Sequence, residues 1–333
     1  MCGRLSASLD RGNSGEERTT RQRSLRCVLR ELSDSFEQGG IDALHQAHFA
    51  SLKKSLRYRL LYRLLNLFLP ITPLLTITRD LDRMVGELGV HGGSRVTLAR
   101  LPIPWRAEMP ARGEAEIRTA PIIVYGTHGS ILTPLLLAAA IDRPDLKMIA
   151  ASYITKLGPN IAACSFPVYA AAPVKVKRAG RKGLVPRVMG WIAWKSEGGL
   201  ERDAAKERNR DSLRRAAEQV RRGGGLLIAP EPRNHRESWR AGIGVLVAEL
   251  TRNPGPHATY LVPWSISGAS ITGIFQLLSR NPLARRLGKL RFRRPVRVAF
   301  GEPIPIQRVV DEVGLDPVRI AAAIETHYRG LGF

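Results

Sequence analysis

The sequence predicts an α/β fold in which a mostly parallel central sheet is flanked by helices, with a helical extension at the N-terminus. From residue 122 onward, short apolar runs of strand length alternate with longer segments of helical periodicity. This alternation is typical of a sheet whose parallel strands are connected by covering helices. Hydrophobic residues make up 44% of the 333-residue chain and charged residues 24%, which favours a folded protein with a substantial core over a disordered one.

The expected strands are short apolar runs bounded by turn residues. They are residues 122–125, 148–151, 166–171, 226–229, 260–264 and 296–300. Helices are expected between them, over residues 131–141, 203–222 and 239–251. Three consecutive glycines, Gly223 to Gly225, follow the second of these helices and favour a left-handed cap with a tight turn.

Three segments are expected along the chain: a flexible tail over 1–40, a helical segment over 41–115 and the α/β domain over 116–333. Seven arginines and six acidic residues are mixed in the first segment, which lacks the apolar stretch of a signal peptide. The three cysteines, Cys2, Cys27 and Cys164, are widely spaced. They favour reduced thiols in a cytoplasmic protein and give no zinc-binding pattern.

Residues 60–78 are strongly apolar, but Arg63, Asn66, Pro70 and Pro73 interrupt them. We therefore expect an interfacial or buried segment and not a membrane span. The leucines of this region recur at helical spacing: Leu52, Leu56, Leu60, Leu64 and Leu67. Basic neighbours make this pattern suitable for a helix lying on an anionic membrane surface. Arg59 and Arg63 interrupt the apolar face, so a helix docked on the main domain is the alternative.

The formal net charge is +23, and most of the excess lies in two stretches. Residues 175–222 hold fifteen basic and six acidic residues, and residues 280–297 hold eight basic residues and no acidic one. Such concentrated charge favours a polyanionic partner, such as a phosphorylated small molecule, an acidic carrier protein or anionic lipid. The alternative is a solvated basic face. Nucleic acid is the weaker option, because aromatic residues for base stacking are only 6% of the chain and are not interleaved with the basic runs.

His128 is the first candidate for catalytic chemistry. It follows the expected strand 122–125 in the segment VYGTHGSILT, and an apolar helix follows it. The carboxyl ends of strands in α/β sheets are where ligands usually bind. Gly126 and Gly129 would let the backbone turn sharply beside an imidazole suited to general-base catalysis near neutral pH. The alternative is a structural histidine.

A second polar segment, APEPRNHRESWRAG, follows the expected strand 226–229. Glu231 stands at the strand end, and Arg233 and Arg236 come close behind it. Guanidinium groups match phosphate oxygens, and a neighbouring carboxylate can orient them or hold a substrate hydroxyl. The alternative is a charged loop with internal ion pairs.

These segments resemble the conserved blocks of the glycerolipid acyltransferases, the superfamily of lysophosphatidic acid and glycerol-3-phosphate acyltransferases. Residues 127–133 (THGSILT) are similar to the family's N-H-x-S-x-x-D block, and residues 230–234 (PEPRN) to its P-E-G-T-R block. Residues 240–242, 261–268 and 298–304 resemble three further blocks in the same order. The resemblance covers about residues 122–306.

The resemblance implies transfer of a fatty acyl chain from acyl-CoA or acyl carrier protein to the hydroxyl of a lysophospholipid or glycerol phosphate, with no bound cofactor or metal. His128 would be the general base, Ser130 would contact substrate, and Arg233 or Arg236 would hold its phosphate. Thr133 stands where the family has an aspartate, so Glu231 is expected to supply the missing carboxylate. The implied partners are an anionic membrane surface, a phosphorylated lipid and acyl carrier protein, and the implied location is the cytoplasmic membrane face. Without the aspartate, a catalytically impaired lipid-binding or scaffolding relative is the alternative.

Overall fold

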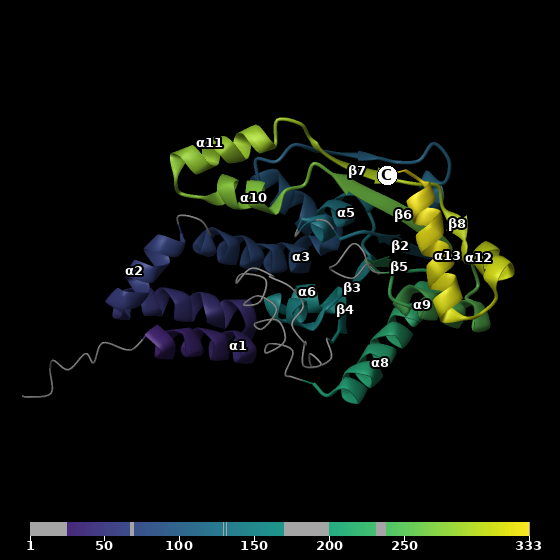
Figure 1. Ribbon diagram of the computed structural model, residues 1–333, viewed down its shortest axis with the longest axis horizontal. Helices are drawn as coiled ribbons and strands as arrows, with labels where there is room; N and C mark the ends of the chain where they lie inside the picture. Colours follow the sequence, from purple (N-terminus) through teal and green to yellow (C-terminus); the bar gives the residue numbers. More distant parts are fainter. Residues whose placement is uncertain are drawn as a thin grey trace, which may run out of the picture.

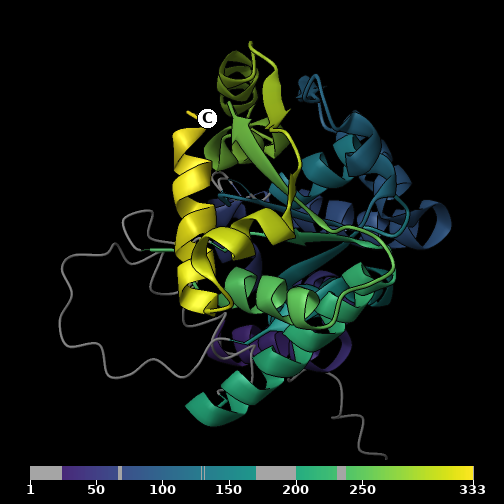
Figure 2. The same cartoon turned by 90° about the vertical axis from the view of Figure 1, so that its right-hand side faces the viewer.

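The computed structural model describes residues 25–66, 70–128, 130, 132–169, 200–230 and 238–332. Among these residues, eight strands form one mixed sheet with helices on both faces (Figures 1 and 2). The order of the strands is β1-β7-β6-β2-β5-β3-β4, and β8 pairs with β6. The predicted fold class, a mostly parallel sheet covered by helices with an N-terminal helical extension, is confirmed.

All six expected strands are present, and two further strands were not predicted. The strands are β1 (Trp105–Glu108), β2 (Ile122–Gly126), β3 (Lys147–Ala151), β4 (Ser165–Val168), β5 (Gly225–Ile228), β6 (Tyr260–Ser267), β7 (Val296–Phe300) and β8 (Ile304–Pro305). The strands β6, β2, β5, β3 and β4 run parallel to one another, and both β7 and β8 run antiparallel to β6. The edge strand β1 runs parallel to β7.

The three expected helices correspond to α5, α8 and α9, with starts that differ by one to three residues. The first half of the chain contains α1 (Leu25–Lys54), α2 (Leu56–Leu65), α3 (Ile71–Arg100), α4 (Glu114–Thr119), α5 (Thr133–Ile141), the 3-10 helix η1 (Ser152–Leu157) and α6 (Pro159–Ala163). The second half contains α8 (Arg202–Arg221), α9 (Gly242–Arg252), α10 (Ile271–Leu278), α11 (Pro282–Arg291), α12 (Ile306–Val313) and α13 (Pro317–Gly330).

Strand β2 lies at the centre of the sheet and is buried along its whole length. Its side chains alternate between two cores: Ile122 and Val124 belong to the core that includes α3 and α5, and Ile123 and Tyr125 to the core that includes α8, α9, α12 and α13. Because both faces are covered by helices, the strand has an uninterrupted apolar sequence instead of an alternating one.

The boundaries of the first two expected segments differ from the structure. Helix α1 begins at Leu25, so residues 25–40 are helical where a flexible tail was expected, and the helix kinks at Gly40, where φ is 64°. Strand β1 falls inside the expected helical segment 41–115 and joins the sheet through β7. The sheet therefore begins about ten residues before the expected domain start, because an edge strand needs only one neighbour and can be polar.

The expected leucine-rich helix is divided in two at Ser55. The Ser55 hydroxyl accepts a hydrogen bond from the Tyr58 backbone N–H at 3.2 Å and begins α2 as its N-cap. Leu52 therefore belongs to α1, and Leu67 lies outside the described residues. No helix in the described part of the chain is both long enough and apolar enough to cross a bilayer.

A buried polar cluster joins the first three helices. The His48 ring on α1 is 2.8 Å from the Tyr58 hydroxyl on α2 through Nδ1, and 3.1 Å from the Thr72 hydroxyl on α3 through Nε2. The Tyr62 hydroxyl also lies 2.8 Å from the Thr72 hydroxyl. Burial, and then the nearby His45, lower the pKa of His48 below its ordinary value of 6.5. A neutral imidazole can donate through one nitrogen and accept through the other, so it satisfies both hydroxyl partners.

This cluster predicts that the protein loses stability below about pH 6.5. The unfolded chain binds a proton at the ordinary His48 pKa and the folded chain only at a lower pH, so the contribution is complete above that pKa and declines as the pH falls. We expect the free energy of urea unfolding to fall more between pH 7.5 and pH 5.5 in the wild type than in His48→Gln. His257→Gln, which changes an exposed histidine, is the control and should behave as the wild type does. An equal fall in the wild type and in His48→Gln would contradict the prediction.

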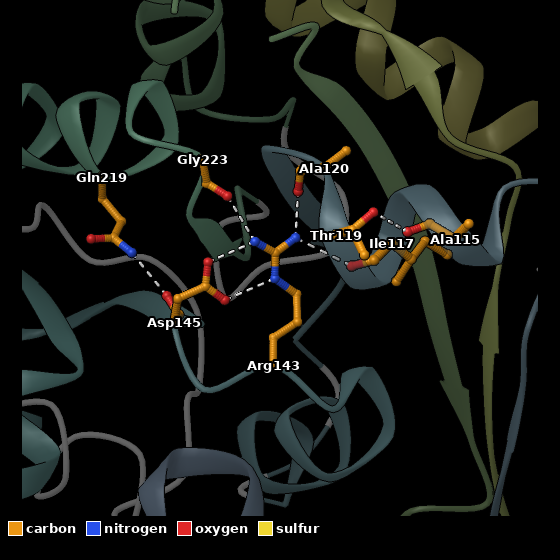
Figure 3. Close-up of polar contacts among 8 residues, drawn as sticks. All are labelled: Ala115, Ile117, Thr119, Ala120, Arg143, Asp145, Gln219 and Gly223. Carbon is orange, nitrogen blue, oxygen red and sulfur yellow. Dashed lines mark hydrogen bonds and ion pairs between the residues drawn. The ribbon is translucent and has the colours of Figure 1, made fainter. Parts of the chain in front are cut away.

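A second buried cluster lies at the amino-terminal edge of the sheet (Figure 3). The Arg143 guanidinium donates to the backbone carbonyls of Ile117, Ala120 and Gly223 and forms a two-pronged ion pair with Asp145, at 2.8 and 2.6 Å. Its side chain is only 4% exposed. Because these carbonyls precede β2 and β5, one side chain holds together the segments that enter two neighbouring strands.

Candidate active site at the carboxyl edge of the sheet

His128 lies two residues beyond the end of the central strand β2 and is exposed. Gly126, the last residue of the strand, packs against Trp264 of the neighbouring β6, and a Cβ atom at Gly126 would come within 2.3 Å of the Trp264 carbonyl oxygen. The glycine is therefore needed for a close approach between strands and not, as expected, for an unusual backbone turn. Gly129 lies outside the described residues. His128 therefore lies at the carboxyl edge of the sheet, beside the closely packed strands β2 and β6.

The connections that follow β2 and β5 leave the sheet toward opposite faces, and this arrangement favours ligand binding near His128. After β2 it continues into α5, which packs on the core face that includes α3, whereas the helix after the neighbouring β5 is α9, which packs on the opposite face. Adjacent parallel strands whose connections leave toward opposite faces open a crevice at their carboxyl ends, where α/β proteins bind ligands. His128 lies at this switch point.

Ser130 and Thr133 form a compact turn between His128 and α5. The Thr133 hydroxyl accepts from the Ser130 backbone N–H at 3.2 Å, the Ser130 hydroxyl accepts from the Leu132 N–H at 3.3 Å, and the Thr133 N–H donates to the Ser130 carbonyl at 3.0 Å. Ser130 is 5% exposed and Thr133 is 1% exposed. Thr133 thus has a structural role in this turn that the sequence did not indicate.

The second expected block follows β5 at the same edge of the sheet. Tyr125 of β2 pairs with Ile228, the last residue of β5, so the segment after Ile228 leaves the sheet beside His128. Glu231, Arg233 and Arg236 lie outside the described residues. On either side of them, the Arg240 N–H donates to the Pro230 carbonyl at 3.1 Å, which brings the start and end of this segment together.

Two residues of the C-terminal helix α13 also reach this edge, and sequence reasoning missed both. The Tyr328 hydroxyl lies 3.2 Å from the Thr127 hydroxyl, next to His128. One turn earlier, the Glu325 carboxylate accepts from the Trp239 N–H at 3.0 Å and is paired with Arg329. No local motif links residues 201 or 86 positions apart, so only the packing of α13 could place them here.

Aromatic packing closes the site on the α13 side. Tyr125, Trp239 and Tyr328 contact one another with ring centroids 5.2 to 6.1 Å apart. Burial, and then the neighbouring Tyr328, raise the pKa of Tyr125 well above its ordinary value, so Tyr125 stays a neutral phenol. This cluster packs α13 and Trp239 against the end of β2.

The two basic stretches differ in how their charge is compensated. On α8, which belongs to the first stretch, Asp203, Asp211 and Glu218 pair with lysine or arginine residues three or four positions away. The second stretch covers α11 and β7 and contains no acidic residue, and among the described residues it forms one ion pair, between Arg297 and Glu108. Residues 175–199 of the first stretch lie outside the described residues. Unpaired positive charge is therefore concentrated around α11.

The fold and the edge site together define a mixed α/β protein with a solvent-facing histidine at the switch point of its sheet. No known family model matches the chain, and no curated protein sequence matches it. Among solved structures, the chain is similar to the 1-acyl-sn-glycerophosphate (LPA) acyltransferase PlsC from Thermotoga maritima, with 14% sequence identity and a TM-score of 0.35. That likeness covers 77% of this chain and 78% of the other.

Proposed function

We propose that the protein is an acyltransferase of the glycerolipid type. It would move a fatty acyl chain from acyl-CoA or acyl carrier protein to a free hydroxyl of a lysophospholipid or glycerol phosphate. The observation that carries this proposal is the exposed His128 after the carboxyl end of the central strand β2, which pairs with β5 up to Ile228. The order of the sequence blocks also supports this function, because the blocks at residues 127–133 and 230–234 follow the neighbouring strands β2 and β5 in the sequence.

In the proposed reaction, His128 removes the proton from the acceptor hydroxyl while its oxygen attacks the thioester carbonyl. A carbon–oxygen bond forms, the carbon–sulfur bond breaks, and the imidazolium returns the proton to the departing thiolate. The protein needs no acylated intermediate, bound cofactor or metal in this scheme. Arg233 and Arg236 would hold the acceptor phosphate, Ser130 would contact substrate, and Glu231 would stabilise the imidazolium.

The proposed setting is the cytoplasmic face of an anionic membrane, where a peripheral protein meets both its lipid acceptor and a soluble acyl donor. We expect the purified wild-type protein, mixed with lysophosphatidic acid and a radiolabelled acyl donor, to form a diacyl product. Acyl-CoA and acyl carrier protein thioesters are offered separately, so the donor is determined in the same experiment. If neither donor gives product over a protein-free control, the proposal is wrong.

A catalytically impaired lipid-binding relative is the second candidate, and Thr133 is the observation that favours it. The Thr133 hydroxyl accepts the Ser130 N–H and provides no negative charge to stabilise an imidazolium. An aspartate at this position can accept the same N–H and add that charge.

We therefore expect Thr133→Asp to raise the rate of acyl transfer by about tenfold or more if the rest of the site is intact. Thr133→Asn, which has the same shape and no charge, is the matched control, and the rate of product formation is the measurement. If both variants leave an active protein unchanged, Thr133 does not limit the rate. If both stay inactive, the lipid-binding role is favoured.

A further inference from the structure

A groove of about 850 Å³ separates the N-terminal helices from the α10–α11 hairpin. One wall comes from the end of α1 and from α2, and the other comes from the turn between α10 and α11. Its volume is in the range of sites that bind small molecules. Phe49, Leu52 and Tyr62 give the walls an apolar part. The groove is therefore large enough, and apolar enough in part, for an amphiphilic ligand.

The charged side chains that line the same groove are all basic. They are Lys53, Arg59, Arg63 and Arg280, and no acidic residue of the described part of the chain lines the groove. The Arg59 side chain donates to the Leu52 and Lys53 carbonyls at 3.1 and 3.3 Å and fixes the end of α1. Among the described residues, the other three cations have no carboxylate partner. Neither of the sequences around the two walls, residues 43–79 and 250–301, contains an aspartate or glutamate.

Asn66 gives a second, independent indication of a ligand. Its side chain lines the groove and is 9% exposed, and its carboxamide oxygen has no hydrogen-bond partner among the described residues. Buried polar atoms are almost always paired in folded proteins. A carboxamide that turns toward a polar headgroup would gain the missing hydrogen bond.

Each wall of the groove also belongs to a helix with an exposed row of leucines. On α2, Leu56, Leu60 and Leu64 are 52, 56 and 60% exposed, whereas Tyr58 and Tyr62 on the opposite side of the helix are buried. On α11 the corresponding residues are Leu283, Leu287 and Leu290, at 66, 45 and 44% exposed. Contiguous apolar surface beside basic residues is the signature of a helix that lies in a membrane interface.

The α11 leucines point away from the body of the hairpin. Gly288, on roughly the opposite side of α11, packs so closely on α10 that an added Cβ would lie 2.7 Å from the Leu277 backbone nitrogen. The inner side of the helix is therefore fixed by contact with α10, which leaves the leucine row free. Figure 1 shows α2 and α11 at the same end of the molecule.

The carboxyl edge of the sheet, where His128 lies, faces this end of the molecule. Strand β6 runs parallel to β2, with Trp264 beside Gly126, and α10 follows directly after the carboxyl end of β6. The hairpin therefore projects from the same sheet edge as His128. A lipid held by the hairpin would approach the site from the bilayer side.

We propose that the groove binds the phosphate headgroup of an anionic phospholipid in a bilayer, while the leucine rows of α2 and α11 insert on either side of it. Lys53, Arg63 and Arg280 surround the phosphate, and Asn66 meets a polar group of the headgroup. The two helices then act as one membrane surface although more than 200 residues separate them in sequence. This inference rests on the proposed function and deepens it, because it names how the protein would lie on the membrane that contains its lipid acceptor, but vesicle binding can be measured without turnover.

Vesicle sedimentation tests the proposal on the full-length protein. We expect binding to phosphatidylglycerol–phosphatidylcholine vesicles, with little binding to phosphatidylcholine alone. Arg63→Glu with Arg280→Glu should weaken that binding by about tenfold or more, since each basic residue near an anionic surface contributes substantially. Leu60→Ser with Leu287→Ser should weaken it by a similar factor through lost apolar insertion.

Matched control pairs lie away from the groove. Arg210→Glu with Arg319→Glu makes the same charge change on α8 and α13, and Leu315→Ser with Val318→Ser removes exposed apolar residues at the other end of the molecule (Figure 1). These pairs should retain binding, and circular dichroism checks that every variant is folded. Equal losses in groove and control variants would overturn the proposal and indicate general charge attraction.

Two further results are informative. One distinguishes a bilayer lipid from a free phosphate compound as the ligand of the groove, and the other distinguishes the groove proposal from the proposed function. If soluble glycerol phosphate displaces the protein from vesicles at millimolar concentration, the groove is a site for a free phosphate compound and the bilayer proposal is wrong. His128→Ala should bind vesicles as the wild type does. Vesicle binding by a protein without acyl-transfer activity would refute the proposed function and leave the groove assignment standing.

Discussion

Replacing His128 by alanine is expected to reduce acyl transfer by about 10²- to 10⁴-fold, the usual contribution of a positioned general base. The imidazole is exposed at the end of β2, so its removal should not disturb the two cores on either side of the strand. The measurement is kcat/KM for product formation with lysophosphatidic acid and the donor that the wild type prefers. The urea-unfolding midpoint of the variant should stay close to that of the wild type.

His257→Ala is the matched control, because His257 is also exposed but lies in the loop before β6 and not at a strand's carboxyl end. It should retain wild-type kcat/KM. If His128→Ala retains it as well, the imidazole is not the base, and the proposed mechanism fails even if the protein transfers acyl groups. A parallel loss in both variants would instead indicate a nonspecific effect.

The central strands could be predicted because their continuous apolar sequences indicate that they are buried. A strand covered on both faces, such as β2, is apolar at every position and stands out between polar loops. The edge strand β1 has the sequence WRAE and is partly exposed at every position, so no apolar run marks it. Strand β8 has only two residues, Ile304 and Pro305, and exists because β6 offers it a partner.

The part of the candidate site that lies within one short segment could be predicted from the sequence. His128 lies between an apolar strand and an apolar helix, and that local order indicates a strand end. The contribution of α13 depends on packing between distant segments, so nothing in the sequence near Tyr328 links it to Thr127. The role of Thr133 also needed the structure, because a threonine can accept from a backbone N–H or from a histidine, and the pattern alone does not distinguish them.

Arg143→Met is expected to lower the free energy of unfolding by about 2–3 kcal/mol, less than the loss of a partner from a fully buried ion pair, because the Asp145 side chain is 39% exposed while that of Arg143 is 4% exposed. The variant would leave the Asp145 carboxylate without its partner and the carbonyls of Ile117, Ala120 and Gly223 without their donor (Figure 3). Chemical denaturation measures the loss. Arg143→Lys should give an intermediate loss, since a single ammonium cannot match the forked geometry of the guanidinium.

The pH dependence of the same cluster gives a second measurement. Burial alone would raise the pKa of Asp145, but the hydrogen bonds and charge of Arg143 outweigh it and hold that pKa below its ordinary value of 3.8. The stabilisation is therefore complete above about pH 4 and is lost as the pH falls through the lowered pKa. Arg143→Met should remove this part of the acid sensitivity.

Arg118→Met is the matched control for the cluster, because Arg118 also pairs with carboxylates but its side chain is 39% exposed. An exposed pair contributes at most about 1 kcal/mol, so this variant should unfold almost as the wild type does. The Arg143 cluster lies at the amino-terminal edge of the sheet and His128 at the carboxyl edge, so the folded fraction of Arg143→Met should keep its acyl-transfer rate. If Arg143→Met loses no more stability than Arg118→Met, the guanidinium is not needed. The backbone hydrogen bonds between β2 and β5 and the two apolar cores would then be enough to hold these strands in place.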